Sequence, residues 1–581
     1  MSLPSSSART ASGDDASFAA LFTPKFITVL REGYSGAHLR ADALAGLTVA
    51  IVALPLSMAI AIASGATPAQ GLYTAIVGGF FVSLLGGSRF QIGGPAGAFI
   101  VLVAATVQQH GMDGLILATF LSGLMLVAVG FLRLGTYVKF IPYPVTVGFT
   151  AGIAVIIFAS QLKELLGLTL EGPEPGPLLE KLPVLLDALP GASPASMGLA
   201  AATVLVILVL KRWRPHWPGL LLAVVGAGVV AYGLDLPVAT IGTRFGGIPS
   251  GIPLPALPDF SWSKVVDVLP SAASFALLGS IESLLSAVVA DGMTGRRHRS
   301  NCELVGQGVA NAASALFGGF CVTGTIARTA TNVRSGAHGP VAGILHSLFL
   351  LAFVAVAAPL ASYVPLACLA GVLAVVAWNM IERHAIRTLV ASSRGETLVL
   401  LVTFGLTVFR DLTEAIVVGF ALGSVLFIHR MSQAVAVERH APFVAEDRAD
   451  DAGDARAPYD EAETADPDIV VYRITGAFFF GAAASIGAVL ERIADTHRVL
   501  VLDLSAVPFL DATGANTIRG LADKAVRRGV VVVLCGAGAT VRRDLAAHGV
   551  APPRVSFSDN VADGIAAARE RLAQDRAGAT P

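Results

Sequence analysis

Long apolar runs separated by short polar stretches fill the chain from about residue 43 to residue 429. Most runs are roughly 18 to 22 residues long, the length that an α-helix needs to cross the hydrocarbon core of a bilayer. The pattern predicts a polytopic α-helical membrane domain at 41–432. Fourteen segments are expected, two of them short, at about 43–63, 69–86, 95–109, 114–132, 143–161, 197–211, 218–233, 270–290, 303–318, 325–336, 340–361, 366–381, 396–410 and 412–429.

A different pattern begins after the last apolar run. Eleven acids against three arginines between Val437 and Asp468 predict an acidic linker at 433–466, because such a charged stretch cannot bury a core. Strand-like and helix-like runs then alternate, which predicts a small soluble α/β domain at 467–573. The expected strands are 469–474, 499–504 and 530–534, and the expected helices are 482–494, 515–528 and 540–548. Residues 1–40 and 574–581 are expected to be tails.

Composition narrows the function classes. Apolar residues make up 54% of the 581 residues and charged residues 14%, with a mean hydropathy of +0.71, whereas soluble domains carry about 25% charged residues. A soluble globular protein is excluded. The net charge is −1, whereas nucleic-acid-binding proteins carry a basic patch, so we do not expect a nucleic-acid partner. No catalytic triad, phosphate loop, CxxC pair or metal-ligand spacing is present, so we expect neither an enzyme nor a cofactor other than a coupling ion.

Basic residues predict the orientation of the membrane domain, because they are retained in cytoplasmic loops. With the N-terminus inside, the inside loops carry Arg133, Lys139, Lys211, Arg212, Arg214, Arg296, Arg297, Arg299, Arg334, Arg387, Arg394 and Arg430. The outside loops carry mainly Lys163, Lys181, Arg244 and Lys264, diluted by acids. Both termini are therefore expected on the cytoplasmic side of the inner membrane. No apolar signal-peptide core precedes the first segment in 1–24.

Small-residue landmarks recur seven segments apart. They are Gly86-Gly87 with Gly318-Gly319, and Pro142 and Gly148 with Pro365 and Gly371. An odd separation means that the two copies insert with opposite topology, so the pattern predicts a 7+7 inverted repeat. Inverted repeats with short, Gly/Pro-interrupted segments are typical of secondary transporters, which bind substrate near the midplane. The alternative is chance recurrence in Gly-rich membrane helices.

Two short segments open with helix breaks, at 93–97 and 323–327. A helix start exposes unpaired N–H groups and a positive dipole end, which together bind anions. Lipid cannot satisfy those groups, so such breaks are tolerated where they line a cavity. The alternative is a pair of tightly packed kinks. We predict an anion site at Gly94, Ala96, Gly97, Ala98, Thr325, Ile326, Ala327 and Arg328.

Three ionisable side chains inside predicted segments, Glu282, Arg328 and His346, are considered as candidates. Glu282, midway along 270–290, and Ser286, one turn further on, are predicted to couple transport to H⁺ or Na⁺, because an intramembrane charge is costly without a function. The alternative for Glu282 is a static ion pair with Arg328. Arg328 itself either adds charge to the anion cavity or snorkels to the cytoplasmic face. His346 is expected to be a packing histidine with hydrogen-bonded ring nitrogens.

The chain resembles the sulfate permease (SulP) family, the bacterial relatives of animal solute carrier family twenty-six. The membrane motifs that carry the resemblance are Asp42-Ala-Leu-Ala-Gly-Leu-Thr48, Gly94-Pro-Ala-Gly-Ala98, Asn301-Cys-Glu-Leu-Val-Gly-Gln-Gly308 and Thr323-Gly-Thr-Ile-Ala-Arg-Thr-Ala330. The motifs Val501-Leu-Asp-Leu-Ser505 and Leu510-Asp-Ala-Thr-Gly514 resemble a STAS domain, named for sulfate transporters and anti-sigma factor antagonists.

The resemblance implies core and gate domains, elevator-like movement of the core, a homodimer, and cation coupling at the position of Glu282. Bicarbonate transporters of the family have Asp and Thr where this chain has Glu282 and Ser286. Thr513 matches the phosphate-accepting hydroxyl of anti-sigma antagonists, which makes it a candidate for regulatory phosphorylation. A cytoplasmic protein partner of the STAS domain and contact with membrane lipid are also expected.

The leading hypothesis is a symporter that moves a small inorganic anion or dicarboxylate, such as bicarbonate or sulfate, with H⁺ or Na⁺. The uracil and xanthine permease class shares the repeat plan but normally lacks a STAS domain. An uncoupled anion channel or exchanger and a membrane-anchored STAS regulator are the remaining alternatives. A regulator does not need a charge at the bilayer centre, and uptake that ignores H⁺ and Na⁺ gradients would identify a channel.

Overall fold

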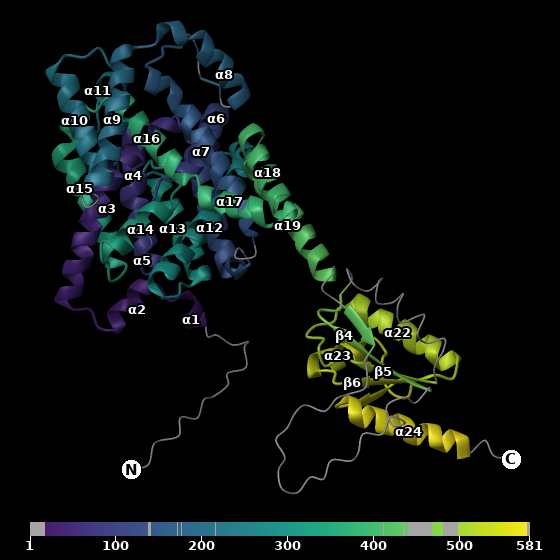
Figure 1. Ribbon diagram of the computed structural model, residues 1–581. Helices are drawn as coiled ribbons and strands as arrows, with labels where there is room; N and C mark the ends of the chain where they lie inside the picture. Colours follow the sequence, from purple (N-terminus) through teal and green to yellow (C-terminus); the bar gives the residue numbers. More distant parts are fainter. Residues whose placement is uncertain are drawn as a thin grey trace. The chain divides into compact units, whose positions relative to one another are not determined.

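The computed structural model describes residues 18–577 except 138–140, 171, 173, 176, 215–216, 411, 434–435, 440–467 and 480–497. The chain divides into two compact units, residues 1–421 and 422–581, which are described separately (Figure 1). Nearly all of the predicted acidic stretch and the expected helix 482–494 lie outside the described residues.

The first unit is helical. Among the described residues, nine helices are long and apolar enough to cross a membrane. The longer helices are α3 (Gly36–Ala63), α6 (Ile100–Phe131), α7 (Tyr143–Leu166), α9 (Pro194–Trp213), α10 (Gly219–Gly233), α12 (Trp262–Thr294), α13 (Ser300–Leu316), α15 (Val341–Ala361), α16 (Leu366–Met380) and α18 (Arg394–Phe409). Helix α19 (Leu412–Gln433) begins in the first unit and ends in the second. The shorter ones are α1 (Phe18–Phe22), α2 (Lys25–Arg31), α4 (Pro68–Tyr73), α5 (Gly79–Leu85), α8 (Leu178–Asp187), α11 (Ile241–Phe245), α14 (Ile326–Arg334) and α17 (Arg383–Ser392).

Several predicted boundaries differ from the observed ones. The expected segments 95–109 and 114–132 form one element, α6, broken only at Gly111, where φ is 71° and ψ is −175°. A glycine tolerates this left-handed backbone, so the chain bends there without a separate loop. Helices α1 and α2 and the first turn of α3 occupy part of the expected N-terminal tail, and α24 (Val561–Ala577) extends into the expected C-terminal tail.

Small residues allow the helices of the first unit to pack closely. A Cβ added to Gly123 in α6 would lie 2.6 Å from the carbonyl oxygen of Gly308 in α13. On the other side of the unit, α15 packs against α3, and a Cβ at Gly46 would lie 2.5 Å from the carbonyl oxygen of Ala342. Such close backbone approach is the usual basis of helix association where lipid removes the hydrophobic driving force. It fixes the helices that surround the helix breaks.

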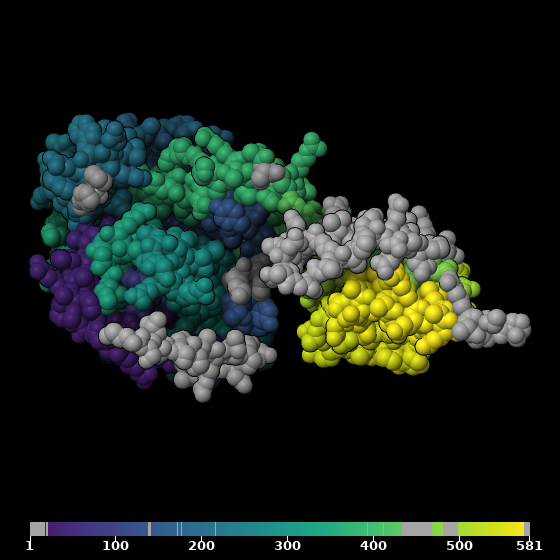
Figure 2. All heavy atoms as spheres, turned by 60° about the horizontal axis from the view of Figure 1, so that its bottom comes forward, coloured from purple at the N-terminus to yellow at the C-terminus, as the bar shows by residue number. Residues whose placement is uncertain are grey.

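The N-terminal helices are held by polar contacts to the start of α13. Arg299 donates from Nη1 to the carbonyl oxygen of Thr23, at 2.8 Å, and to Oγ1 of Thr28, at 2.9 Å. Figure 2 shows this purple N-terminal part of the unit on the surface beside teal residues from the middle of the chain. Residues before α3 are therefore packed onto the helical unit from Phe18 onward.

Two short strands join the predicted helix breaks. In β1 (Gly93–Gly94) and β2 (Thr323–Gly324), Gly93 pairs with Gly324 and Gly94 with Thr323 in an antiparallel register. All four residues are buried. Because buried backbone groups require hydrogen-bond partners, the pairing satisfies both breaks at once. It brings the start of α6, through a 3₁₀ turn at Gly97–Phe99, beside the start of α14.

The second unit is a five-stranded sheet with helices. The strands β3 (Ala436–Arg439), β4 (Ile469–Thr475), β5 (Val499–Asp503), β6 (Val531–Cys535) and β7 (Ser556–Ser558) lie in that order. The β3–β4 pair is antiparallel and the other pairs are parallel. Apolar residues of α22 (Ala512–Arg527) pack in one core cluster and those of α24 in another. The three predicted strands are confirmed as β4, β5 and β6.

The position of β3 changes the interpretation of the acidic stretch. Residues 433–466 were expected to separate the membrane domain from the α/β domain, but β3 already belongs to the sheet and precedes 440–467. The acidic residues after Arg439 therefore connect two adjacent strands of one sheet. A strand of four residues carries too little pattern to be recognised from sequence.

Candidate anion site at the crossing of two half-helices

The paired strands β1 and β2 place two helix starts next to each other in the buried part of the first unit. We call these two helix starts, at Gly97 and at Ile326, the half-helices, and we call the place where β1 and β2 join them the crossing. The first N–H groups of a helix have no acceptor within that helix. At the start of α14 these include the N–H groups of Ile326 and Ala327, and at the 3₁₀ turn before α6 those of Gly97 and Ala98. Two positive dipole ends therefore meet at one place, which is the arrangement predicted from the sequence.

Arg328 lies at this crossing and does not snorkel. Its side chain is one of the largest fully buried in the described chain, and the residue is 2% exposed. Nη2 donates to Oγ of Ser57 at 3.1 Å and to the carbonyl oxygen of Pro95 at 3.3 Å. Nε and Nη1 are buried and have no partner among the described residues. A buried cation with two unpartnered donor nitrogens can bind an anionic oxygen.

A glycine makes room for this guanidinium. A Cβ at Gly94 in β1 would overlap Nη1 of Arg328 and lie 3.1 Å from its Cζ. The reciprocal contact occurs on the other strand, where a Cβ at Gly324 would overlap the amide of Gln91 and lie 2.9 Å from its Cγ. Each strand of the crossing thus accepts a long polar side chain from the segment that carries the other strand.

The predicted anion residues differ in accessibility. Gly97 and Ile326 are partly exposed and Ala327 is exposed, whereas Ala96 and Ala98 are 6% and 2% exposed. Gly97 faces α7 and α16, because its Cβ would lie 3.0 Å from Cδ1 of Ile157 and 3.9 Å from Sδ of Met380. Partly exposed Gly97 therefore lies next to these two helices.

Thr325 differs from its predicted role. Its backbone N–H donates to the carbonyl oxygen of Ile92 at 3.0 Å, and its hydroxyl donates to the same oxygen at 3.3 Å. This N–H therefore helps to join the two half-helices. The donors left for a ligand on this side come from Ile326, Ala327 and Arg328.

Glu282 lies on the face of α12 that contacts β2 and α14. Within that stretch of α12, the carbonyl of Gly279 accepts from the hydroxyl of Thr323 at 3.2 Å, and Ser286 donates to the hydroxyl of Thr329 at 3.0 Å. Glu282 is 8% exposed, and its carboxylate has no hydrogen-bond or ion-pair partner in the described part of the chain. The static pair with Arg328 is therefore absent. Glu282 and Ser286 do not bond to each other.

Sequence reasoning missed a buried polar network beside the crossing and misjudged one histidine. Glu303 and Gln307 were noted only as parts of a motif, yet both are fully buried in α13. The sequence signal that could have indicated this network is the presence of polar residues within a predicted membrane segment. His346 in α15 was expected to be hydrogen-bonded, but both of its buried ring nitrogens lack partners among the described residues. That expectation was wrong: the ring is buried without a partner, while the backbone of His346 packs against α3, where a Cβ on Gly46 would lie 3.1 Å from its N.

Thr513 lies in the first turn of α22 and is exposed. The preceding Asp511 caps this helix, since its carboxylate accepts from the N–H of Gly514 at 2.8 Å. The hydroxyl is thus placed at a helix start where added phosphate would meet free N–H groups but also the carboxylate of Asp511.

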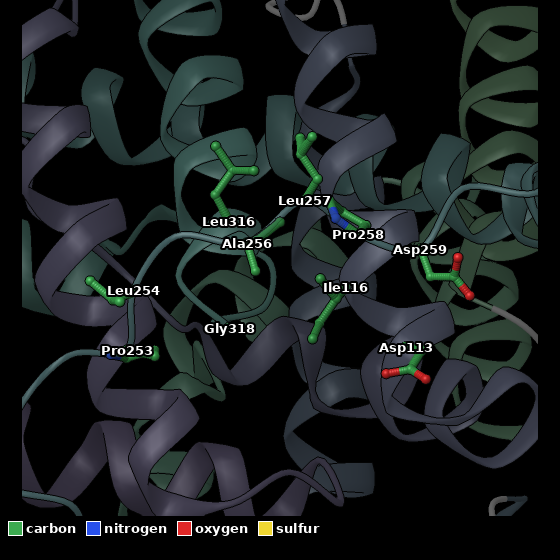
Figure 3. Close-up of a pocket in the computed structure, with 11 residues that line it drawn as sticks. Asp113, Ile116, Pro253, Leu254, Ala256, Leu257, Pro258, Asp259, Leu316 and Gly318 are labelled. Carbon is green, nitrogen blue, oxygen red and sulfur yellow. The ribbon is translucent and has the colours of Figure 1, made fainter.

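A separate cavity of ≈ 340 Å³ lies between α6, the end of α13 and the loop before α12 (Figure 3). Apolar residues dominate its lining, together with the carboxylates of Asp113 and Asp259. Lys264 pairs with Asp259 at 2.5 Å. None of the predicted anion residues lines this cavity, and its two carboxylates disfavour an anion. The crossing of the half-helices remains the candidate site.

Comparisons with known proteins show the family of the chain. The model described as "Sulfate permease family" matches residues 39–403, and the one described as "STAS domain" matches residues 462–564. A Bacillus subtilis protein named "Putative sulfate transporter YvdB" is 39% identical over 87% of this chain and 93% of its own length.

Two solved structures are similar to the chain. The transmembrane domain of a cyanobacterial bicarbonate transporter, BicA, is 33% identical over 66% of this chain and 98% of its own, with a TM-score of 0.60. The murine anion transporter Slc26a9 in its inward-facing state is 19% identical over 97% of this chain and 96% of its own, with a TM-score of 0.81. The second likeness concerns the fold alone. Together, the family match over most of the helical unit and the near full-length relative establish that the chain belongs to the sulfate permease family of multi-pass membrane anion transporters, which are not enzymes, and carries a C-terminal STAS domain.

Proposed function

We propose that the protein takes up a small oxyanion, sulfate or bicarbonate, by binding it at the crossing of the two half-helices. The observation that carries the proposal is Arg328, buried at the crossing with two donor nitrogens, Nε and Nη1, that have no partner among the described residues. The relatives named above as sulfate and bicarbonate transporters support this substrate class. Dicarboxylates belong to the same chemical class, because they also present negatively charged oxygen atoms to the N–H donors.

The electrostatics of the crossing favour an anion over a neutral ligand. Each helix start contributes about half a positive charge, and Arg328 contributes a full one. Planar guanidinium N–H groups match the spacing of two oxygens in sulfate or bicarbonate. Gly97, Ile326 and Ala327 add backbone N–H groups on the partly open side of the crossing. The anion would therefore replace the missing partners of Arg328.

We further propose that Glu282 couples anion movement to H⁺ or Na⁺. Its carboxylate has no partner in the described chain and lies between two contacts of α12 with β2 and α14. A cation bound there would balance part of the negative charge that an anion brings to the same crossing. Ser286 supplies a second oxygen one helical turn away, and its hydroxyl already binds Thr329.

The remaining family expectations stay predictions for this chain. They comprise the 7+7 inverted repeat, elevator movement of a core against a gate, a homodimer, cytoplasmic termini, phosphorylation of Thr513 and a protein partner for the STAS domain. For a gate, the helices that Gly97 lies next to, α7 and α16, are the candidates.

Uptake by purified protein in liposomes tests the proposal. Radiolabelled sulfate and bicarbonate are offered with H⁺ and Na⁺ gradients imposed separately. We expect accumulation that follows one of the two gradients, and an affinity order of wild type, Arg328→Lys, Arg328→Ala. The exposed Arg387→Ala is the matched control and should behave as wild type. Equal affinities in the Arg328 series would remove this residue from the site, and gradient-independent flux would identify a channel or exchanger.

A further inference from the structure

A second buried carboxylate, Glu303, lies outside the proposed anion site. The residue is fully buried in α13. Its Oε2 accepts from the N–H of Ser88 at 2.8 Å, and its Oε1 accepts from Nε2 of Gln91 at 2.7 Å. The hydroxyl of Ser283 lies 3.4 Å from the same Oε1. A buried carboxylate is tolerated only when it is hydrogen-bonded in this way, so its position is determined by these donors.

Gln91 connects this carboxylate to the crossing. It stands two residues before the first residue of β1, and its amide lies against Gly324 of β2. The neighbouring Ile92 donates its N–H to Oγ1 of Thr329 at 3.2 Å and accepts from the N–H of Thr325 at 3.0 Å. Holding the amide of Gln91 therefore holds the chain on both sides of the strand pair.

Helix α13 also fixes the other strand. Asn311, two turns after Glu303, donates from Nδ2 to the carbonyl oxygen of Val322 at 2.9 Å and accepts from the N–H of Val322 at 3.0 Å. The amide of Gln307, between them, donates to the same carbonyl oxygen. Val322 directly precedes β2. Side chains of α13 thus fix the position of the backbone just before β1 and just before β2.

We propose that Glu303, acting through Gln91, is a positioning residue that sets how the two half-helix starts approach each other and thereby the affinity for the anion. The proposal rests on the anion site proposed above. Glu303 touches neither the anion nor the coupling cation in this scheme. Its charge is used to accept hydrogen bonds, because both oxygens already face donors. Small displacements matter, since N–H groups bind an anion well only when they are held in the productive geometry.

Exchanging the carboxylate of Glu303 and the amide of Gln91 gives a specific test. In Glu303→Gln, an amide NH₂ group faces either the N–H of Ser88 or the amide of Gln91, so the donors repel. The double variant Glu303→Gln/Gln91→Glu restores one donor and one acceptor in the reverse order. We expect the single variant to raise the KM for sulfate or bicarbonate uptake about tenfold, or ~1.4 kcal/mol. We expect the double variant to recover most of that loss.

The measurement is liposome uptake of radiolabelled sulfate and bicarbonate, with KM, maximal rate and the H⁺ and Na⁺ dependence determined for each variant. The maximal rate per folded molecule and the gradient dependence should stay near the wild-type values. The exposed Glu180→Gln is the matched control for a lost carboxylate. Where Glu303→Gln does not fold, Gln91→Met removes the same donor at similar volume and carries the test.

Three results would overturn the proposal: an unchanged KM in Glu303→Gln and Gln91→Met, a double variant no better than the single ones, or loss of the gradient dependence in Glu303→Gln. The last result would make Glu303 an ion carrier. The Arg328 series separates this failure from that of the anion site. If Arg328→Ala weakens affinity while Glu303→Gln does not, the site stands and the positioning role fails.

Discussion

Replacing Gly94 with alanine offers a graded test of the crossing, because the substitution acts on Arg328 without removing its charge. The new Cβ would lie 3.1 Å from Cζ and overlap Nη1, so the guanidinium must move by more than about 1 Å to reach van der Waals distance. Its two hydrogen bonds, 3.1 Å to Ser57 and 3.3 Å to Pro95, are already near the upper limit and would break.

The size of the effect follows from the displaced charge. At an effective dielectric constant of about 20, two unit charges 4 Å apart attract by about 4 kcal/mol, and moving them to about 5.5 Å leaves about 3 kcal/mol. The loss of about 1 kcal/mol corresponds to a dissociation constant about fivefold higher. We therefore expect Gly94→Ala to bind the anion more weakly than wild type and more tightly than Arg328→Ala, which loses the whole attraction.

Isothermal titration of the solubilised proteins with sulfate and bicarbonate measures these constants. Gly226→Ala in α10 is the matched control, because no atom lies within 4 Å of its added Cβ. A Gly94→Ala protein that is folded and binds with the wild-type constant, while Arg328→Ala binds weakly, would refute the steric reasoning. It would mean that the guanidinium reaches the anion from a different position.

Three further predictions concern coupling and the STAS domain. Glu282→Gln should fold and bind the anion but lose gradient-driven accumulation in liposomes, because an amide cannot exchange a proton and is a poorer Na⁺ ligand; undiminished accumulation would exclude a coupling role. A chain that ends at Gln433 lacks all described strands of the STAS sheet and should retain anion binding in titrations, so complete loss of binding by a folded truncation would contradict the site. Asp503 is 1% exposed; burial opposes its charged form, but hydrogen bonds from Ser505 and Arg473 outweigh burial and lower the pKa of the carboxyl. Because the folded pKa is depressed, this stabilisation is present above the unfolded pKa of about 3.9 and is lost as pH falls through the folded pKa. Arg473→Ala should therefore lower the free energy of unfolding of the STAS unit, measured by its resistance to protease, by about 1–2 kcal/mol at pH 7. The effect should be much smaller at acid pH.

The helix breaks were predictable because they interrupt an apolar pattern that otherwise runs for a full membrane span. Gly93–Gly94 and Thr323–Gly324 stand out for this reason, and the structure pairs them. Their cross-strand partners were not predictable. Nothing local indicates that Arg328 packs over Gly94 or that Gln91 packs over Gly324, because these contacts join residues more than 230 positions apart.

The polar interior of α13 shows a second limit. An apolar helix that contains Glu303 signals a buried charge, but the sequence does not state whether the charge faces a ligand or protein donors. The answer depends on the turn at Ser88 and on Gln91, which lie on another segment. The unpartnered ring of His346 likewise depends on contacts with other segments, which its own stretch of sequence does not indicate.

The strand β3 has a consequence for chain cleavage. It pairs with β4 through four residue pairs, from Ala436 with Thr475 to Arg439 with Tyr472, and the acidic residues 440–467 connect the two strands. A peptide bond cut within that connection would leave β3 on the membrane fragment and the rest of the sheet on the other. The two fragments would still be joined by the backbone hydrogen bonds of an antiparallel pair. A nicked protein should therefore remain associated on a sizing column and separate in denaturing gels, so proteolysis in the acidic stretch would not release the STAS domain.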